Sequence, residues 1–215
     1  MPLPAAIRDV YLQPGPMTAL GRHAAAVAPL PGDVAGVCDA VQGLVLHQFW
    51  AQAYGTDVGP NRAEQQHIRG AADMLDALID NRPGPLGERR EPGDRFVGVC
   101  RHFSVLSTAI LRAHGVPARC RVGFGAYFDP KTRVDHWVVE HWDDGQDRWV
   151  LTDSQIDALQ KAALIRWRPR ATASSSPATP GGSAAPAATI PCATASSTCM
   201  GCGSSPATCC ATSPA

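Results

Sequence analysis

Residues 93–128 read GDRFVGVCRHFSVLSTAILRAHGVPARCRVGFGAYF, and this stretch decides the fold that we expect. Apolar residues recur in it at three- and four-residue spacing, which indicates the buried face of a helix: Phe103, Leu106, Ile110 and Ala113. Gly115, with a proline two residues later, is typical of a helix end. The helix should therefore run from about Cys100 to His114. Residues 116–128 are rich in β-branched, aromatic and glycine residues and predict a strand.

The predicted helix begins at a cysteine. The first N–H groups of a helix have no partner within it, and together with the helix dipole they favour a negative charge, here the thiolate of Cys100. The same N–H groups are suited to stabilise an oxyanion. Taken alone, Cys100 is also compatible with a small buried residue, which is what most free cysteines are.

A second informative stretch is residues 134–155, VDHWVVEHWDDGQDRWVLTDSQ. Two valine-rich and aromatic segments flank Asp144-Gly145, a strong signal for a two-residue type I′ turn. With this turn His136 lies directly opposite Asp153, whereas a bulge or a longer turn would shift the pairing. A cysteine nucleophile needs such a pair, because the imidazole takes the thiol proton and the carboxylate orients the imidazole.

Other histidines and carboxylates fit this site less well. His141 lies at odd spacing from His136, so we expect it on the opposite face of the sheet. His102 lies too close to Cys100 along the helix to face the thiol squarely. The remaining acidic residues of this region are expected at strand ends, in the turn and at the start of a short helix: Asp135, Asp143, Asp144 and Asp157.

Three blocks of this sequence together resemble the core of the transglutaminase-like superfamily. They are GVCRHFSVLSTAILRAHGVPARCRVGF at 98–124, DHWVVEHW at 135–142 and RWVLTDSQ at 148–155. The resemblance extends over about residues 60–165, and the N-terminal helices resemble those of uncharacterised bacterial proteins of this superfamily.

The resemblance implies a papain-like α+β fold. It consists of N-terminal helices, a core helix headed by the cysteine, and an antiparallel sheet that carries the histidine and the aspartate. By resemblance, Cys100 is the nucleophile, His136 the general base and acid, and Asp153 the orienting carboxylate. No residue of the sequence can be assigned as a side-chain donor to the oxyanion.

The function that we expect is thiol-dependent acyl transfer on amide or peptide substrates. Hydrolysis is favoured over crosslinking, because the bacterial proteins that the chain resembles are more often associated with hydrolysis. The chemistry needs no metal ion and no organic cofactor. Two alternatives remain: a non-catalytic module that binds peptides in its cleft, and an inactive, truncated product of a transglutaminase-like gene.

Composition excludes several other classes of protein. The 215 residues carry a formal net charge of zero, so we expect no nucleic-acid partner. No apolar run approaches the roughly 20 residues that span a bilayer, and the N-terminus lacks the pattern of a secretory signal, so we expect no membrane partner. Three cysteines in residues 1–170 suit a reducing compartment and predict a cytoplasmic protein.

One domain is expected over residues 1–168, with a helical N-terminal part at 1–82 and the catalytic core at 95–160. In the helical part, Asp33 is suited to cap a helix that continues to about residue 54. A second helix should begin at a capping box formed by Asn61 and Glu64 and end near residue 81.

The segment 169–215 is different in composition. No charged residue follows Arg170, and the segment consists largely of Ala, Ser, Thr, Pro, Gly and Cys, which predicts disorder. Cys199-x-x-Cys202 lacks a second pair with the spacing of zinc ligands, so we assign no metal site. One hypothesis for this segment is a reading-frame shift near residues 166–171 of a GC-rich gene.

Overall fold

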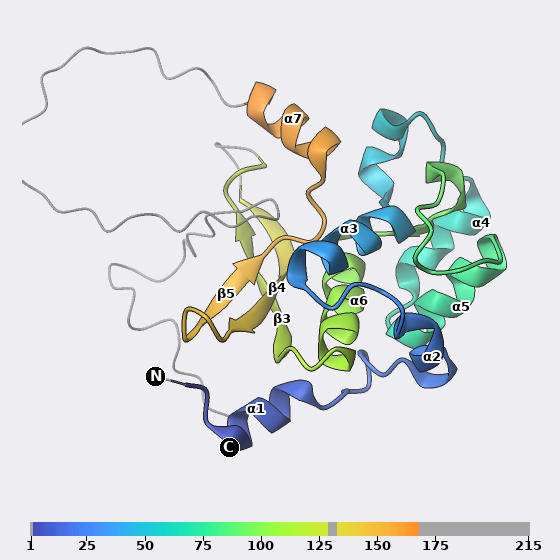
Figure 1. Ribbon diagram of the computed structural model, residues 1–215. Helices are drawn as coiled ribbons and strands as arrows, with labels where there is room; N and C mark the ends of the chain where they lie inside the picture. Colours follow the sequence, from blue (N-terminus) through green and yellow to red (C-terminus); the bar gives the residue numbers. More distant parts are fainter. Residues whose placement is uncertain (1, 129–132, 168–215) are drawn as a thin grey trace, which may run out of the picture.

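A computed structural model describes residues 2–128 and 133–167 of the chain. Helices and a small antiparallel sheet form one body, in which helix α6 (Cys100–Ala113) lies between the sheet and the N-terminal helices (Figure 1). The fold is therefore of the expected α+β class. The predictions made for the segment 169–215, including its cysteines, lie outside the described residues.

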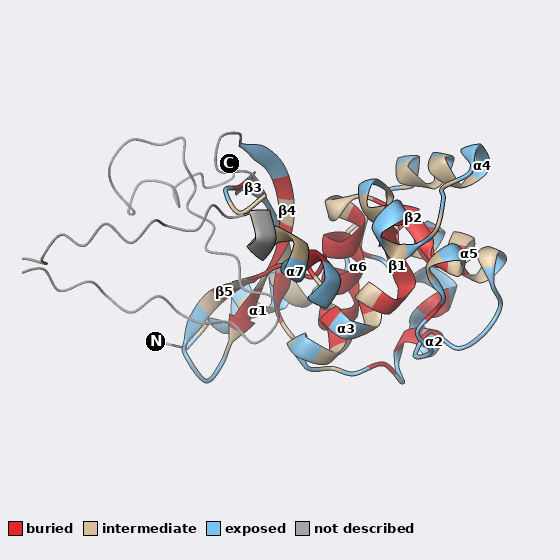
Figure 2. Ribbon diagram, turned by 90° about the horizontal axis from the view of Figure 1, so that it is seen from above, coloured by how far each residue is buried: buried red, intermediate tan, exposed pale blue. Residues whose placement is uncertain are grey.

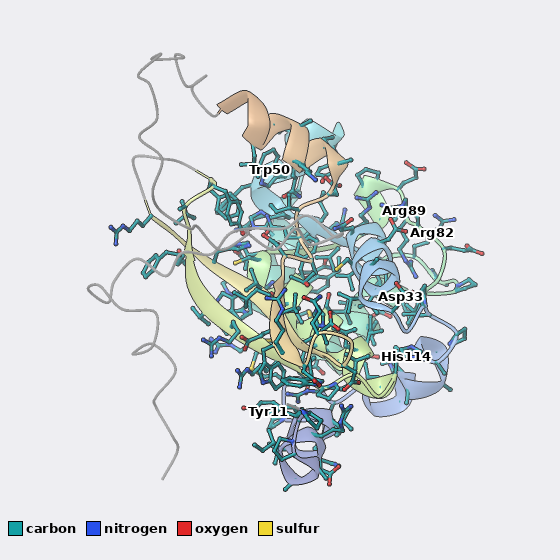
Figure 3. All side chains as sticks on the ribbon, turned by 60° about the vertical axis from the view of Figure 1, so that its left-hand side comes forward. Tyr11, Asp33, Trp50, Arg82, Arg89 and His114 are labelled. Atoms are coloured by element: carbon teal, nitrogen blue, oxygen red, sulfur yellow. The ribbon has the colours of Figure 1, made fainter. Side chains whose placement is uncertain are left out.

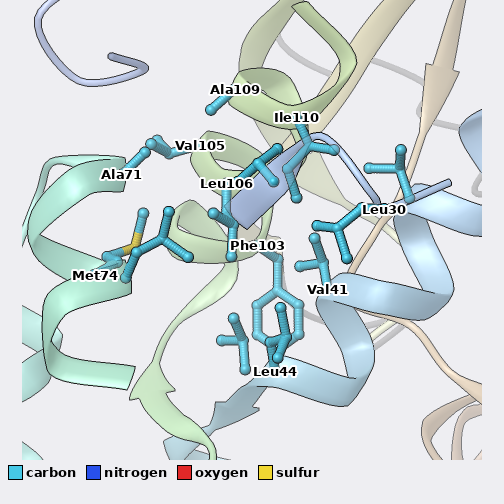
Figure 4. Packing of buried hydrophobic residues seen from close by; sticks show 14 of the residues in the cluster. Leu30, Val41, Leu44, Ala71, Met74, Phe103, Val105, Leu106, Ala109 and Ile110 are labelled. Atoms are coloured by element: carbon cyan, nitrogen blue, oxygen red, sulfur yellow. The ribbon is translucent and has the colours of Figure 1, made fainter. Parts of the chain in front are cut away.

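Helix α6 is the centre of the core. Buried residues line most of its length, as the red ribbon in Figure 2 shows. Phe103, Leu106 and Ile110, which form the stripe that the sequence predicts, pack between α3 (Val34–Leu44) and α5 (Ala71–Asn81) (Figure 4). The helix ends where predicted, because Gly115 adopts φ +78°, a left-handed conformation that glycine takes without a steric penalty.

The sheet consists of three antiparallel strands in the order β3-β4-β5. Their bounds are Ala118–Gly125, Val134–Asp143 and Arg148–Thr152. Ala118 and Val139 belong to the same hydrophobic cluster as α6, with Cys120 packed against it. On α1 (Ala5–Leu12), Tyr11 lies against the sheet (Figure 3), where its hydroxyl accepts a hydrogen bond of 2.6 Å from Arg119.

The register of the β4–β5 hairpin differs from the prediction. Asp143 pairs with Arg148, so the loop has four residues instead of two and the pairing is shifted by two positions. The prediction that Asp153 lies directly opposite His136 is therefore wrong, since this register places Asp153 opposite Val138. The cause is local: the Asp143 side chain accepts the backbone N–H groups of Gly145 and Gln146, which stabilises a longer turn, and Asp147 takes φ 50° to close it. A shift of two residues keeps every side chain on its predicted face.

The N-terminal part contains more than helices. Strand β1 (Val45–His47) follows α3 directly and pairs in parallel with β2 (Phe96–Gly98). The remaining elements are α2 (Ala24–Val27), α4 (Pro60–Ala63), α7 (Ala158–Trp167) and the 3₁₀ turns η1 (Gly21–His23), η2 (Gln48–Tyr54), η3 (Glu64–His67) and η4 (Pro92–Asp94).

Two predictions for this part need correction. Asp33 does cap α3, since its carboxylate accepts the N–H of Gly36 at 2.9 Å, but the helix ends at Leu44. Pairing with β2 draws residues 45–47 into a strand instead. Asn61 lies inside α4 rather than capping a long helix, and α5 begins only at Ala71.

Candidate active site

The thiol lies at the start of α6. Val99, the residue before it, is extended and follows β2 directly. Cys100 is a half-buried cysteine outside any disulfide, and it is the first residue of α6, at the end of the helix where backbone N–H groups have no partner within it. The structure confirms the predicted start of the helix at this residue.

A buried histidine fixes the backbone beside the thiol. Nδ1 of His102 accepts the N–H of Val99 at 2.9 Å, and Nε2–H donates to the carbonyl of Ile68 at 2.8 Å. Burial, foremost, lowers the pKa of His102, so the ring is neutral and holds both bonds. A Cβ on Gly98 would approach this ring to 2.8 Å, so only glycine fits there without displacing His102.

His136 and Asp153 form a buried pair, with side chains 4% and 1% exposed. Nε2–H of His136 donates to Oδ2 of Asp153 at 2.7 Å, and the ring also forms a hydrogen bond with the Cys100 side chain. Because Asp153 occupies Nε2, the other ring nitrogen is the one left for the thiol. The three residues singled out in the sequence are thus together.

The electrostatics of this group favour a charged imidazole. Burial lowers the pKa of His136, but the hydrogen bonds to Asp153 and Cys100 and the negative charges of both outweigh it and raise the pKa to about 9. A proton taken from the thiol is therefore held by the ring at neutral pH, which is the condition for a thiolate–imidazolium pair.

Two further residues support Asp153 and were not singled out from the sequence. The hydroxyl of Tyr127 donates to Oδ2 at 2.5 Å, and the N–H of Gln155 donates to Oδ1 at 2.9 Å. Tyr127 also lies edge-on to the His136 ring, at 5.8 Å between centroids. Burial and Asp153 raise the pKa of Tyr127, so the hydroxyl stays a donor. In the sequence, the aromatic pair at residues 127–128, shortly after β3, was the one feature that could have pointed to this role of Tyr127.

Two of the alternative histidines and carboxylates weighed in the sequence analysis form hydrogen bonds outside the candidate site. His141 bonds to Thr152 at 3.2 Å, away from the His136–Asp153 pair. Asp157 accepts the hydroxyl of Tyr54 at 2.6 Å. Within the described part of the chain, no group of three or more His, Cys, Asp or Glu side chains is placed to hold a metal ion. No helix in that part is long and apolar enough to cross a bilayer.

A small pocket lies on the sheet beside His136. It has a volume of about 80 Å³, and its lining includes Gly123, Val138 and Leu151 from the three strands. Phe124 also lines it and is 46% exposed. The pocket thus offers an apolar surface next to the imidazole.

Residues 52–154 match the family model described as Transglutaminase-like superfamily. Among solved structures, the chain is similar to a candidate cysteine protease from Cytophaga hutchinsonii, with 17% identity and a TM-score of 0.46. It is also similar to the periplasmic domain of TgpA from Pseudomonas aeruginosa, with 21% identity and a TM-score of 0.36. The alignments cover 71% and 77% of this chain but 43% and 53% of these two proteins, so the chain spans about half their length. No curated protein matches the chain significantly.

Proposed function

We propose that the chain, whose residues 52–154 match the transglutaminase-like superfamily, catalyses acyl transfer through Cys100, His136 and Asp153. One observation carries this proposal: a thiol at a helix N-terminus touches a buried imidazole that a buried carboxylate orients. Buried titratable groups with shifted pKa values are concentrated at functional sites, and this arrangement matches the requirements of a cysteine nucleophile.

The first half of the reaction is acylation. The Cys100 thiolate attacks the carbonyl carbon of an amide, and the electron pair of the C=O bond moves to oxygen. When the oxyanion collapses, the C–N bond breaks and the His136 imidazolium gives its proton to the departing amine. The acyl group then remains on sulfur as a thioester, and His136 is neutral and ready to act as a base.

The second half releases the acyl group. In hydrolysis, His136 takes a proton from water, the hydroxide adds to the thioester carbonyl, and Cys100 leaves as a thiolate. In crosslinking, a primary amine replaces water and a new amide forms. We favour hydrolysis of a peptide or amide. The apolar pocket beside His136 is suited to a side chain of such a substrate.

The site requires neither a metal ion nor an organic cofactor for this chemistry. Within the described residues, Cys38, Cys100 and Cys120 form no disulfide bond, which suits the reducing cytoplasm that we propose as the compartment.

The test uses 4-nitrophenyl acetate, an activated acyl donor. We expect a burst of 4-nitrophenolate and an acetyl adduct on Cys100, detected by mass spectrometry of the quenched protein. Cys100→Ala should abolish both, whereas Cys38→Ala and Cys120→Ala, the matched controls, should retain both. A wild-type protein without burst or adduct would contradict the proposal and favour a non-catalytic peptide-binding module or an inactive product.

Hydrolysis and crosslinking are then separated with a blocked glutaminyl peptide and hydroxylamine. Release of ammonia and free glutamyl product with little hydroxamate is the expected result. Hydroxamate as the main product would show that amines outcompete water, and the preference for hydrolysis would be wrong.

A further inference from the structure

A third buried histidine, His47, lies beside the candidate active site and has no role in the mechanism above. It ends strand β1 and pairs with Gly98 of β2, two residues before Cys100 in the chain. Adjacent strands lie about 4.8 Å apart, so this pairing fixes His47 next to the backbone that leads into the nucleophile. This position could not be predicted from the sequence, because the two strands are far apart along the chain.

The ring of His47 packs on the helix that carries the thiol. Its centroid is 6.4 Å from that of Phe103, in a stacked arrangement, and Phe103 lies one turn after Cys100 on α6. Phe49 covers the ring from another side, with centroids 5.5 Å apart. The residue is 8% exposed, so its ring is largely removed from water.

His47 is an uncharged hydrogen-bond donor in this position. Burial, and then repulsion from His136 and His102, lower its pKa to about 4, against an opposing effect of Asp153. Its Nδ1 accepts the N–H of Phe49 in a long hydrogen bond of 3.4 Å. A neutral imidazole that accepts through Nδ1 carries its proton on Nε2. His47 is therefore prepared to donate through Nε2 and to remain neutral while doing so.

We propose that His47 stabilises the oxyanion of the acyl-transfer reaction by donating Nε2–H to it, together with the N–H groups at the start of α6. The inference rests on the proposed function and adds a residue to it. No proton is transferred: the negative oxygen of the tetrahedral intermediate accepts the hydrogen bond, and Nε2 keeps its hydrogen when the C=O bond re-forms. A neutral donor suits this place, since a second imidazolium would be repelled by the one on His136.

The test compares two reactions of the same thiol. Acylation by 4-nitrophenyl acetate passes through an oxyanion, whereas alkylation by iodoacetamide is a displacement at carbon that forms none. His47→Phe keeps a ring of similar shape and removes the donor. We expect it to lower the acylation rate about 10²-fold while the alkylation rate stays within about twofold of wild type. His47→Gln restores an N–H donor and should recover at least about tenfold of the lost acylation rate.

Controls make the outcome decisive. His141→Gln changes a buried histidine of the three-stranded sheet and should leave both rates at wild-type values. If His47→Phe does not fold, His47→Leu removes the donor as well and takes its place. Equal losses of acylation and alkylation, or no loss in either, would overturn the role of His47. A wild type that is alkylated at Cys100 but never acylated would instead refute the acyl-transfer function, and the role of His47 with it.

Discussion

Replacing Asp153 by asparagine should remove most of the proton affinity that the fold gives to His136. The pKa of His136 is raised from 6.5 to about 9 although burial works against it, and the hydrogen bond from Nε2 to Asp153 is the largest of the opposing effects. The difference of about 2.5 pKa units corresponds to about 3 kcal/mol of preference for the charged ring. With a neutral amide at 153, burial should prevail and the pKa should fall by about 2 units or more.

The same change alters the pH dependence of stability. A pKa that is higher in the folded than in the unfolded chain contributes stability that is complete below about pH 6.5 and is lost as the pH rises through about 9. We therefore expect the contribution of His136 to lower the wild-type free energy of unfolding by up to about 3 kcal/mol across this range. In Asp153→Asn this slope should be largely absent.

Two measurements check this prediction. The Cε1–H resonance of His136 reports its titration by NMR, and urea unfolding at about pH 6 and pH 9 reports the slope. Asp157→Asn is the control, because Asp157 bonds to Tyr54 and to the N–H of Gln160 instead of to His136. It should lower stability by a similar amount at both pH values. If His136 still titrates near pH 9 in Asp153→Asn, the carboxylate is not what holds the proton and the reasoning is refuted.

Three further predictions concern the surroundings of the site. Gly98→Ala should cost about 2–4 kcal/mol in urea unfolding, since the new Cβ would lie 2.8 Å from the ring of His102; Gly123→Ala, with nothing within 4 Å of its Cβ, should cost less than about 0.5 kcal/mol. A similar cost for both would contradict this. The pKa of His47 is lower in the folded than in the unfolded chain, so the wild type should lose stability as the pH falls from about 6.5 through about 4. His47→Phe should abolish this loss. Unchanged acid unfolding in the variant would rule this out. Tyr127→Phe should lower the free energy of unfolding at neutral pH by about 1.5–3 kcal/mol, since a buried carboxylate loses a donor, and a change below about 0.5 kcal/mol would show that the bond contributes little.

The sequence predicted the parts of the site that are encoded locally. The bounds of α6 follow from an apolar stripe and from Gly115, and the structure places the helix end within one residue of the prediction. The hairpin was predicted with the wrong turn, because the competition of the Asp143 side chain for backbone N–H groups was not considered. His136 and Asp153 are hydrogen-bonded despite the shifted register, since a shift of two residues preserves the face on which each side chain lies. A shift of one residue would have separated them.

The parts that were missed depend on contacts between distant segments. Residues 45–47 show no alternation that would mark a strand, and they follow a helix without a break. They become a strand because β2, some fifty residues later, pairs with them and continues into Cys100. Three-residue strands of this kind carry too few residues for a periodic signal. The N-terminal part was therefore predicted to be helical support alone, and His47 was not considered for the site.

The pKa values of two buried histidines, His136 and His47, are shifted in opposite directions. Both rings lose water, which by itself favours the neutral form. His136 has a carboxylate and a thiol as partners, and they raise its pKa to about 9. For His47, burial and then repulsion from His136 and His102 lower the pKa to about 4. Between these values one ring is charged and the other neutral. The proposed acyl transfer requires this division, because the proton carrier must hold a charge beside the thiolate while the oxyanion donor must not compete for that proton.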